Sequence, residues 1–352
     1  MSVTALIGTI KGSWLLRADD ARQVWRLEGP AFKGWKVTAA TREEDGSYLL
    51  ATASDVYGPA LQRTRDFKEF EQLESSPAWP EESGRKLKQI WRLRAHGGSI
   101  FAGVDEAGLF RSADGGATWE SICGLNEHET REAWQPGFGG LCLHEILVDP
   151  TNQDRMWIGI SAVGVFRTDD GGVTWNSKND GVPVILEDQD HQGIGYCVHG
   201  LVQDPDDPNK IYRQDHVGMF VTDDGGDSWV RQEDGLPSTF GFPIVMDPHT
   251  RHLFCLPLES DEFRIPVDGR FDIYRSTDAA RTWAPSSTGL PRSDTYAGVL
   301  RQAMAVDGCN PCGIYVGTTA GTIYVSNDVG ESWATIPCHL PRILCVEALM
   351  ED

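Results

Sequence analysis

Short apolar runs recur along the whole chain, separated by glycine, proline and aspartate, and no long segment repeats its apolar residues with the period of a helix. Several runs end alike, with aspartate followed by proline or glycine. They are Glu145 to Pro150, Gly200 to Pro205, Pro243 to Pro248 and Ala303 to Gly308. Runs of this length bounded by turn residues are typical of β-strands. The pattern therefore predicts many short strands that end in acidic turns.

A second pattern is an eight-residue motif with serine or threonine first, aspartate third, small residues in the middle and tryptophan last. Its five clear copies are 112–119, 168–175, 222–229, 276–283 and 326–333. Their tryptophans, Trp119, Trp175, Trp229, Trp283 and Trp333, are 56, 54, 54 and 50 residues apart. Degenerate copies surround Asp66 and Asp19, which makes seven. A period near fifty indicates repeated supersecondary units.

The motif suits a tight turn between two strands. The aspartate can accept amide hydrogens of the turn, glycine permits positive φ, and the hydroxyl side chains can cross-link the loop. The tryptophan then anchors the following strand in the core. The motif is similar to the Asp box, and over nearly its whole length the chain resembles the sialidase-like superfamily of Asp-box (BNR-repeat) β-propellers, among the WD40/YVTN/BNR-like repeat proteins.

This resemblance implies an all-β, seven-bladed propeller with Asp-box hairpins, and we expect one domain over residues 1–352. The apolar segment 343–350 follows the seventh motif, whereas the first repeat lacks a strand before its own motif. We therefore predict that 343–350 joins the N-terminal blade and closes the ring. In the family the Asp boxes lie opposite the ligand pocket, so the other loops become the candidates for a site.

Charge narrows the function classes. The 352 residues include 31 Lys and Arg against 52 Asp and Glu, a formal net charge of -21. This argues against nucleic-acid and membrane-surface partners, which need basic patches.

The N-terminus lacks a basic leader and no apolar run could span a membrane. The 8 cysteines are dispersed, so we expect a cytoplasmic protein with reduced thiols. The CxxC from Cys309 to Cys312 is expected to be an inert turn.

Histidines supply one candidate site. His144 and His199 each precede a turn aspartate by five residues in adjacent repeats, and His216 lies in a nearby loop. One interpretation is a divalent-metal site of imidazoles that activates water, to which His191 in the loop 187–191 could add. The alternative, which we favour slightly, is that His144 and His199 are equivalent residues that form hydrogen bonds between blades.

Two carboxylates supply a second candidate site. Asp105 and Asp215 stand where the other repeats have a small residue in the loop before the third strand. Paired carboxylates could act as acid and base on a glycoside. The alternative, two solvated rim acids in a very acidic protein, is the stronger.

Residues 263–266 read FRIP, which matches a sialidase motif whose arginine clamps the substrate carboxylate. The motif precedes the first Asp box in sialidases but falls in the sixth repeat here, which argues against sialidase activity. Arg264 could still reach over the pocket, joined by Arg301 and Arg92. Aromatic side chains in the entry loops would supply stacking walls; these are Trp134, Tyr196, Phe240 and Tyr296.

Two functions remain open. The first is an enzyme, a hydrolase or lyase acting on a small polar or sugar-like ligand, with the histidines and carboxylates as acid–base or metal groups. The long entry loops 120–141 and 176–196 favour it. The second is a non-catalytic propeller that binds a protein partner, which the lack of a complete catalytic signature favours.

Overall fold

The computed structural model describes residues 3–19, 21–186 and 193–350. Their strands form seven four-stranded antiparallel sheets, the blades of a β-propeller, which confirms the predicted fold class. Within the described ranges helix is confined to α1 (Cys123–Asn126) and short 3-10 turns. No helix in this part of the chain is long and apolar enough to cross a membrane.

By its internal contacts the chain divides into two compact units. The first comprises residues 1–37, 199–223 and 230–352, and the second 38–198 and 224–229. The single domain expected over 1–352 stays a prediction.

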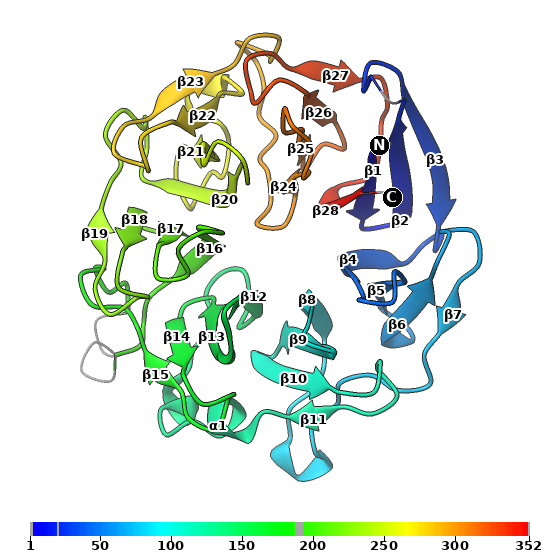
Figure 1. Cartoon of the computed structure of the whole chain (residues 1–352), viewed down its shortest axis with the longest axis vertical. Helices are drawn as coiled ribbons and strands as arrows, with labels where there is room; N and C mark the ends of the chain where they lie inside the picture. The colour runs from blue at the N-terminus through cyan, green and yellow to red at the C-terminus, as the bar shows by residue number, and fades with distance from the viewer. Residues whose placement is uncertain (1–2, 20, 187–192, 351–352) are drawn as a thin grey trace. The chain divides into compact units, whose positions relative to one another are not determined.

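The first unit holds four sheets (Figure 1). In sheet order their strands are β28 (Ile343–Met350), β1 (Val3–Thr9), β2 (Gly12–Ala18) and β3 (Trp25–Ala31); β16 (Val198–Gln203), β17 (Ile211–Asp215), β18 (Gly218–Thr222) and β19 (Val230–Arg231); β20 (Phe240–Met246), β21 (Leu253–Leu258), β22 (Ile273–Ser276) and β23 (Ala284–Ser286); β24 (Met304–Val306), β25 (Ile314–Gly317), β26 (Ile323–Ser326) and β27 (Ala334–Ile336).

The second unit holds the other three sheets. Their strands are β4 (Lys36–Arg42), β5 (Tyr48–Ser54), β6 (Gly58–Thr64) and β7 (Glu71–Gln72); β8 (Gln89–His96), β9 (Ser99–Asp105), β10 (Gly108–Ser112) and β11 (Glu120–Ser121); β12 (Leu143–Asp149), β13 (Asn152–Ile160), β14 (Gly164–Thr168) and β15 (Asn176–Ser177).

The C-terminal strand completes the N-terminal blade, as predicted. β28 pairs antiparallel with β1 along nearly its whole length, from Val3 opposite Met350 to Thr9 opposite Ile343. Figure 1 shows β28 next to β1. β28 thus covers the edge that β1 would otherwise expose.

The repeated motif forms the hydrogen-bonded turn that its residues predict. In the first clear copy Thr118 donates from its amide and hydroxyl to Asp114, at 2.9 and 2.6 Å, and the Gly116 amide donates to Ser112 Oγ at 2.7 Å. The aspartates of the other four clear copies accept the same pair of hydrogen bonds from the residue four positions on. These carboxylates are therefore occupied within their own turns.

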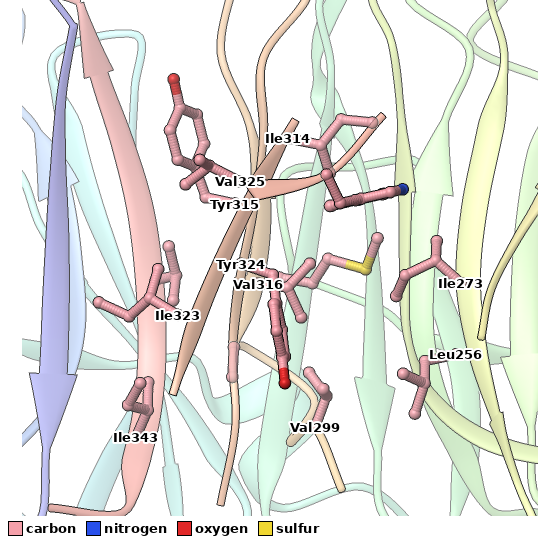
Figure 2. Packing of buried hydrophobic residues seen from close by; sticks show 14 of the residues in the cluster. Leu256, Ile273, Val299, Ile314, Tyr315, Val316, Ile323, Tyr324, Val325 and Ile343 are labelled. Atoms are coloured by element: carbon pink, nitrogen blue, oxygen red, sulfur yellow. The ribbon is translucent and has the colours of Figure 1, made fainter. Parts of the chain in front are cut away.

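Apolar side chains that alternate along the strands build the cores. In the first unit Ile314, Val316, Ile323 and Val325 are almost completely buried in one cluster (Figure 2). The second unit buries comparable clusters around Leu109, Ile158 and Phe166, and around Leu49, Ala102 and Phe110. The strands thus hold their connecting loops on a packed scaffold.

Candidate functional site

The first unit gathers four of the predicted site residues around two aromatic side chains, Phe240 and Phe242. These four are His199, His216, Arg264 and Arg301. Phe242 lies on β20 two positions after Phe240, so both rings point to the same face of the strand. Their ring centroids are 5.1 Å apart, and both side chains are buried, at 5% and 3% exposure. The pair forms an apolar platform at the start of β20.

His199, on β16, packs against this platform and is held by the backbone. Its ring lies 5.1 Å from Phe240 and 4.8 Å from Phe242, and only 1% of the residue is exposed. Its Nδ1 is 2.7 Å from the carbonyl oxygen of Gly241. Because a carbonyl oxygen only accepts, Nδ1 carries the hydrogen, and in the neutral ring the lone pair is on Nε2.

His216 is the more accessible of the two histidines. It lies in the β17–β18 hairpin, 5.6 Å from His199 between ring centroids, with 28% of its side chain exposed. Its Nε2 is 3.6 Å from Oδ2 of Asp261, whose side chain is 40% exposed. Asp261 is a site residue that sequence reasoning missed, because nothing in its own segment, the loop after β21, links it to the β17–β18 hairpin.

Arg264 and Arg301 both stack on Phe242. Their guanidinium carbons are 5.6 and 4.8 Å from the ring centroid, within the range of cation–π attraction. Arg264 also donates from Nε to the Asp261 carbonyl at 2.9 Å, which fixes the loop that carries it. Among the described residues nothing accepts a hydrogen bond from the buried Nε of Arg301. Two cations therefore stand beside the histidines in an otherwise acidic protein.

Asp215 belongs to the same hairpin as His216 but faces the interior. Its carboxylate and the Arg213 guanidinium are both completely buried, and Oδ2 lies 2.8 Å from Nε and 2.6 Å from Nη2 of Arg213. Burial raises the pKa of Asp215, while Arg213 opposes the shift. The carboxylate reaches no solvent here, so an acid–base role for Asp215 stays a prediction that requires the hairpin to open.

The remaining predicted histidine and carboxylate lie in the second unit. His144 is completely buried on β12, with Nε2 3.1 Å from the carbonyl of Val198, the first residue of β16. His144 and His199 are thus each hydrogen-bonded to a backbone carbonyl oxygen. Asp105 is partly buried; burial raises its pKa, and Lys88 Nζ at 3.6 Å from Oδ1 acts against this.

The predicted aromatic walls of the second unit prove to be buried. Trp134 is 7% exposed, donates from Nε1 to Thr130 Oγ1 at 2.9 Å, and has the Arg131 guanidinium 4.5 Å from its ring. Tyr196 is 8% exposed. Neither ring offers an open face to a ligand in this structure, because packing in the loops has covered them. Arg92 lies at a bulge of β8 and is partly exposed. His191 and the loop 187–191 lie outside the described residues.

The chain is similar in sequence to two xyloglucanases. No family model matches. The chain is 27% identical over 209 residues to an oligoxyloglucan-reducing end-specific xyloglucanase of Emericella nidulans, a match that covers 56% of this chain and 24% of that protein. It is 23% identical over 238 residues to xyloglucanase Xgh74A of Acetivibrio thermocellus, covering 57% and 26%. The chain therefore spans about a quarter of the length of these relatives.

Solved structures share the fold. A GH74 xyloglucanase from Xanthomonas campestris superposes with a TM-score of 0.65 at 16% identity, over 94% of this chain and 52% of that one. A protein from Lactobacillus plantarum gives 0.67 at 12% identity, over 99% and 100%. YCF48 bound to D1 peptide gives 0.55 at 15% identity, over 88% and 85%. At these identities the likeness establishes a seven-bladed β-propeller, a fold that both glycan-cleaving and peptide-binding proteins use.

Proposed function

We propose that this propeller acts on a glycan, as a glycosidase-like enzyme, at the site around Phe242. The observation that carries the proposal is the partly exposed His216–Asp261 pair beside the Arg264 and Arg301 guanidiniums. The sequence similarity to two xyloglucanases supports a sugar polymer as the ligand class.

His216 is the proton-transfer group in this proposal. An imidazole can accept a proton at one ring nitrogen and donate one from the other, and the Asp261 carboxylate, 3.6 Å from Nε2, orients the ring. Arg264 and Arg301 would bind polar groups of the sugar and offset negative charge that develops during cleavage. Phe242 places both guanidiniums, since it lies beneath them. Hydrolysis and elimination of the glycan are both compatible with these roles.

A divalent metal ion bound by the histidines is a further part of this proposal. His199 holds its Nδ1 hydrogen on the Gly241 carbonyl, the arrangement in which a histidine offers Nε2 to a metal. His216, whose ring centroid lies 5.6 Å from that of His199, would supply a second imidazole nitrogen. Elemental analysis of protein purified without a metal-affinity tag, before and after His199→Gln, tests this: less than one metal ion per several chains in both samples removes the metal from the proposal.

Binding without cleavage is the alternative. Glycosidases of the common types place two carboxyl groups about the scissile bond. In the described part of the first unit the site presents Asp261, whereas Asp215 is paired with Arg213 in the interior. A propeller that holds a glycan or a protein segment at the same site needs no second carboxylate.

Hydrolysis and binding assays separate these functions. Xyloglucan, its oligosaccharides and a uronic-acid polysaccharide are incubated with the protein; new reducing ends or unsaturated ends are measured, and binding is followed by calorimetry. We expect the protein to release new ends from the glycan. His216→Gln and Asp261→Asn should each lower this cleavage rate by at least about a hundredfold. The matched control is His249→Gln, an exposed histidine after β20 that bonds the Gly308 carbonyl. Glycan binding without new chain ends supports the alternative. The absence of both binding and cleavage would overturn the proposal.

A further inference from the structure

A second hollow in the first unit is built differently from the Phe242 site. It has a volume of about 410 Å³ and lies between the segment 294–297 and the β25–β26 hairpin. Its lining is mostly hydroxyl and aromatic side chains, namely Thr295, Tyr296, Thr318, Thr319, Thr322 and Tyr324. Pockets that hold small molecules have roughly 300–1,000 Å³, so a single sugar ring would fit.

Tyr296 is the exposed aromatic wall of this hollow and packs against Gly269. The side chain is 63% exposed. Its ring edge rests on Gly269, where an added Cβ would come within 3.3 Å of Cε1. The amide of Thr295 also donates to the Gly269 carbonyl at 3.0 Å. A lone exposed aromatic residue is ordinary, but this one is held with an open ring beside a hollow.

The opposite rim is fastened to the same segment. The Gly298 amide donates to Thr319 Oγ1 at 3.1 Å, and the Thr319 amide donates to the Gly298 carbonyl at 2.9 Å. Beneath them Tyr324 is buried against Phe271, with ring centroids 4.8 Å apart. Figure 2 shows the Tyr324 hydroxyl directed toward Val299, away from that of Tyr315. The hollow is thus formed before a ligand arrives, which lowers the entropy cost of binding.

The chemistry of the lining selects an uncharged, hydroxyl-rich ligand. Thr318 and Thr319 each accept a backbone amide at Oγ1, and Thr295 donates from Oγ1 to the Ser293 carbonyl. Because a hydroxyl has one donor and two acceptor positions, the lining still offers donors and acceptors to a ligand, as the hydroxyls of a sugar do. The lining has one charged group, Asp294, and no cation, in contrast to the Arg264 and Arg301 pair. An anionic ligand would therefore gain nothing here, while the apolar face of a sugar ring could lie on Tyr296.

One loop joins this hollow to the Phe242 site. The segment 259–272 carries Asp261 and Arg264 at one place and Gly269, which supports Tyr296, at another. Gly298 packs so closely on it that an added Cβ would be 2.8 Å from the Arg264 carbonyl oxygen. A ligand of more than one sugar could therefore contact both places.

We propose that the hollow at Tyr296 is a second glycan subsite, which takes one uncharged sugar ring of a chain whose neighbouring unit occupies the Phe242 site. The inference rests on the proposed glycan function and adds the ligand class and the placement. The ring is held by stacking on Tyr296 and by the threonine hydroxyls.

The test is calorimetric binding of a neutral xyloglucan oligosaccharide to the full chain and its variants. We expect Tyr296→Ala to weaken binding roughly tenfold, equivalent to about 1.4 kcal/mol. Tyr296→Phe keeps the ring and should stay within about threefold of the unsubstituted protein. Tyr57→Ala is the matched control, because Tyr57 is also exposed, at 79%, and contributes to neither place. Thermal unfolding of each variant verifies that the fold is intact.

The outcomes separate the subsite from the proposed function. If the unsubstituted protein binds the oligosaccharide and His216→Gln weakens binding or cleavage, but Tyr296→Ala binds as tightly as the unsubstituted protein, the subsite is overturned and the function stands. If the unsubstituted protein binds no neutral or acidic glycan, both fail. A preference for a fully uronic oligosaccharide that Tyr296→Ala does not alter would also overturn the uncharged subsite.

Discussion

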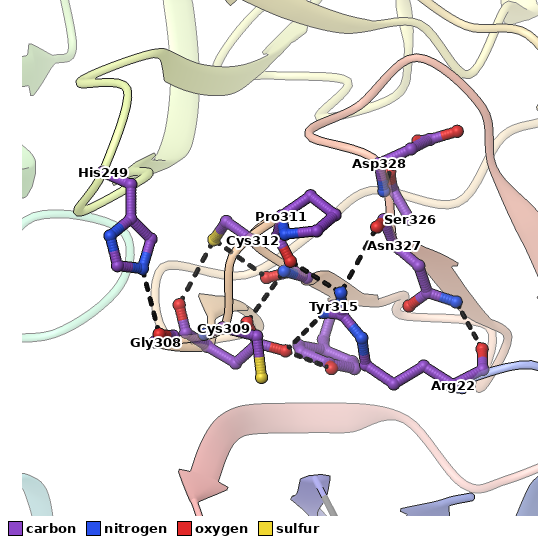
Figure 3. Close-up of polar contacts among 12 residues, drawn as sticks. Arg22, His249, Gly308, Cys309, Pro311, Cys312, Tyr315, Ser326, Asn327 and Asp328 are labelled. Atoms are coloured by element: carbon purple, nitrogen blue, oxygen red, sulfur yellow. Dashed lines mark hydrogen bonds and ion pairs between the residues drawn. The ribbon is translucent and has the colours of Figure 1, made fainter. Parts of the chain in front are cut away.

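Arg22 and Asp307 form a buried ion pair across 285 residues of sequence. Nη1 of Arg22, in the loop after β2, donates to Oδ2 of Asp307, after β24, at 3.2 Å (Figure 3). The same guanidinium donates to the Pro311 carbonyl at 2.6 Å, and the Tyr315 hydroxyl donates to Asp307 Oδ2 at 2.7 Å. The pair thus links the N-terminal blade to the blade formed by β24 to β27.

Removal of either charge should destabilise the fold. Asp307 is 0% exposed and Arg22 9%, so Arg22→Ala or Asp307→Asn leaves the other group buried without its counter-charge. We expect the free energy of unfolding to fall by about 3 kcal/mol, and by about 1 kcal/mol for Tyr315→Phe. Chemical denaturation measures both. The control is Glu331→Gln, which breaks an exposed ion pair with Arg275 and should change stability by less than about 1 kcal/mol. Equal effects at both pairs would contradict the prediction.

Deletion of residues 341–352 should abolish the native fold. β28 supplies the neighbour of β1 along the whole strand, and without it β1 becomes an open edge over a buried core. We expect insoluble or non-cooperatively unfolding protein, measured by circular dichroism during thermal unfolding. Recovery in solution with the separate peptide 341–352 would support strand loss as the cause. A soluble truncated chain that unfolds in a cooperative thermal transition would contradict this prediction.

The turn aspartates should make stability depend on acid pH. Hydrogen bonds from Thr118 lower the pKa of Asp114 to about 2, and those from Thr174 do the same for Asp170, from an ordinary 3.8. A carboxylate with a depressed pKa stabilises the fold above its unfolded pKa, and this contribution is lost as pH falls from about 4 to about 2. Asp170→Asn should therefore lower the melting temperature more at about pH 6 than at about pH 2. An unchanged difference at the two pH values would refute this origin.

The cysteines of the CxxC segment should react slowly. Cys312 is buried and donates from Sγ to the Asp307 carbonyl at 3.2 Å, and burial raises the pKa of both its thiol and that of Cys309. Because the thiolate is the reactive form, alkylation at neutral pH should label the exposed Cys123 first. Mass spectrometry of timed samples measures the order, with the denatured chain as the control. Labelling of Cys309 and Cys312 ahead of Cys123 would argue for a reactive pair.

Local patterns made much of this fold predictable. The hydrogen bonds of Asp114 with Thr118 span four residues, so their turn can be inferred from the motif itself. The regular spacing of the tryptophans then indicates the number of blades. The apolar segment 343–350 has the composition and the position expected of the strand that the N-terminal blade lacks. The proximity of His199 and His216 was also expected, because both lie in one repeat. A repeat restricts where its equivalent residues can stand.

The sequence alone determined the seven repeats, their turns and the closing strand, because each depends on contacts between near neighbours or on a regular period. Only the tertiary structure decided which side chains form the site. Phe242 lies under Arg264 and Arg301. Asp261 lies opposite His216, whereas Asp215 is paired with Arg213 in the interior. The contacts of Phe242 and His216 join loops of different blades, whose approach is set by packing of the sheets and by loop conformation rather than by any spacing along the chain.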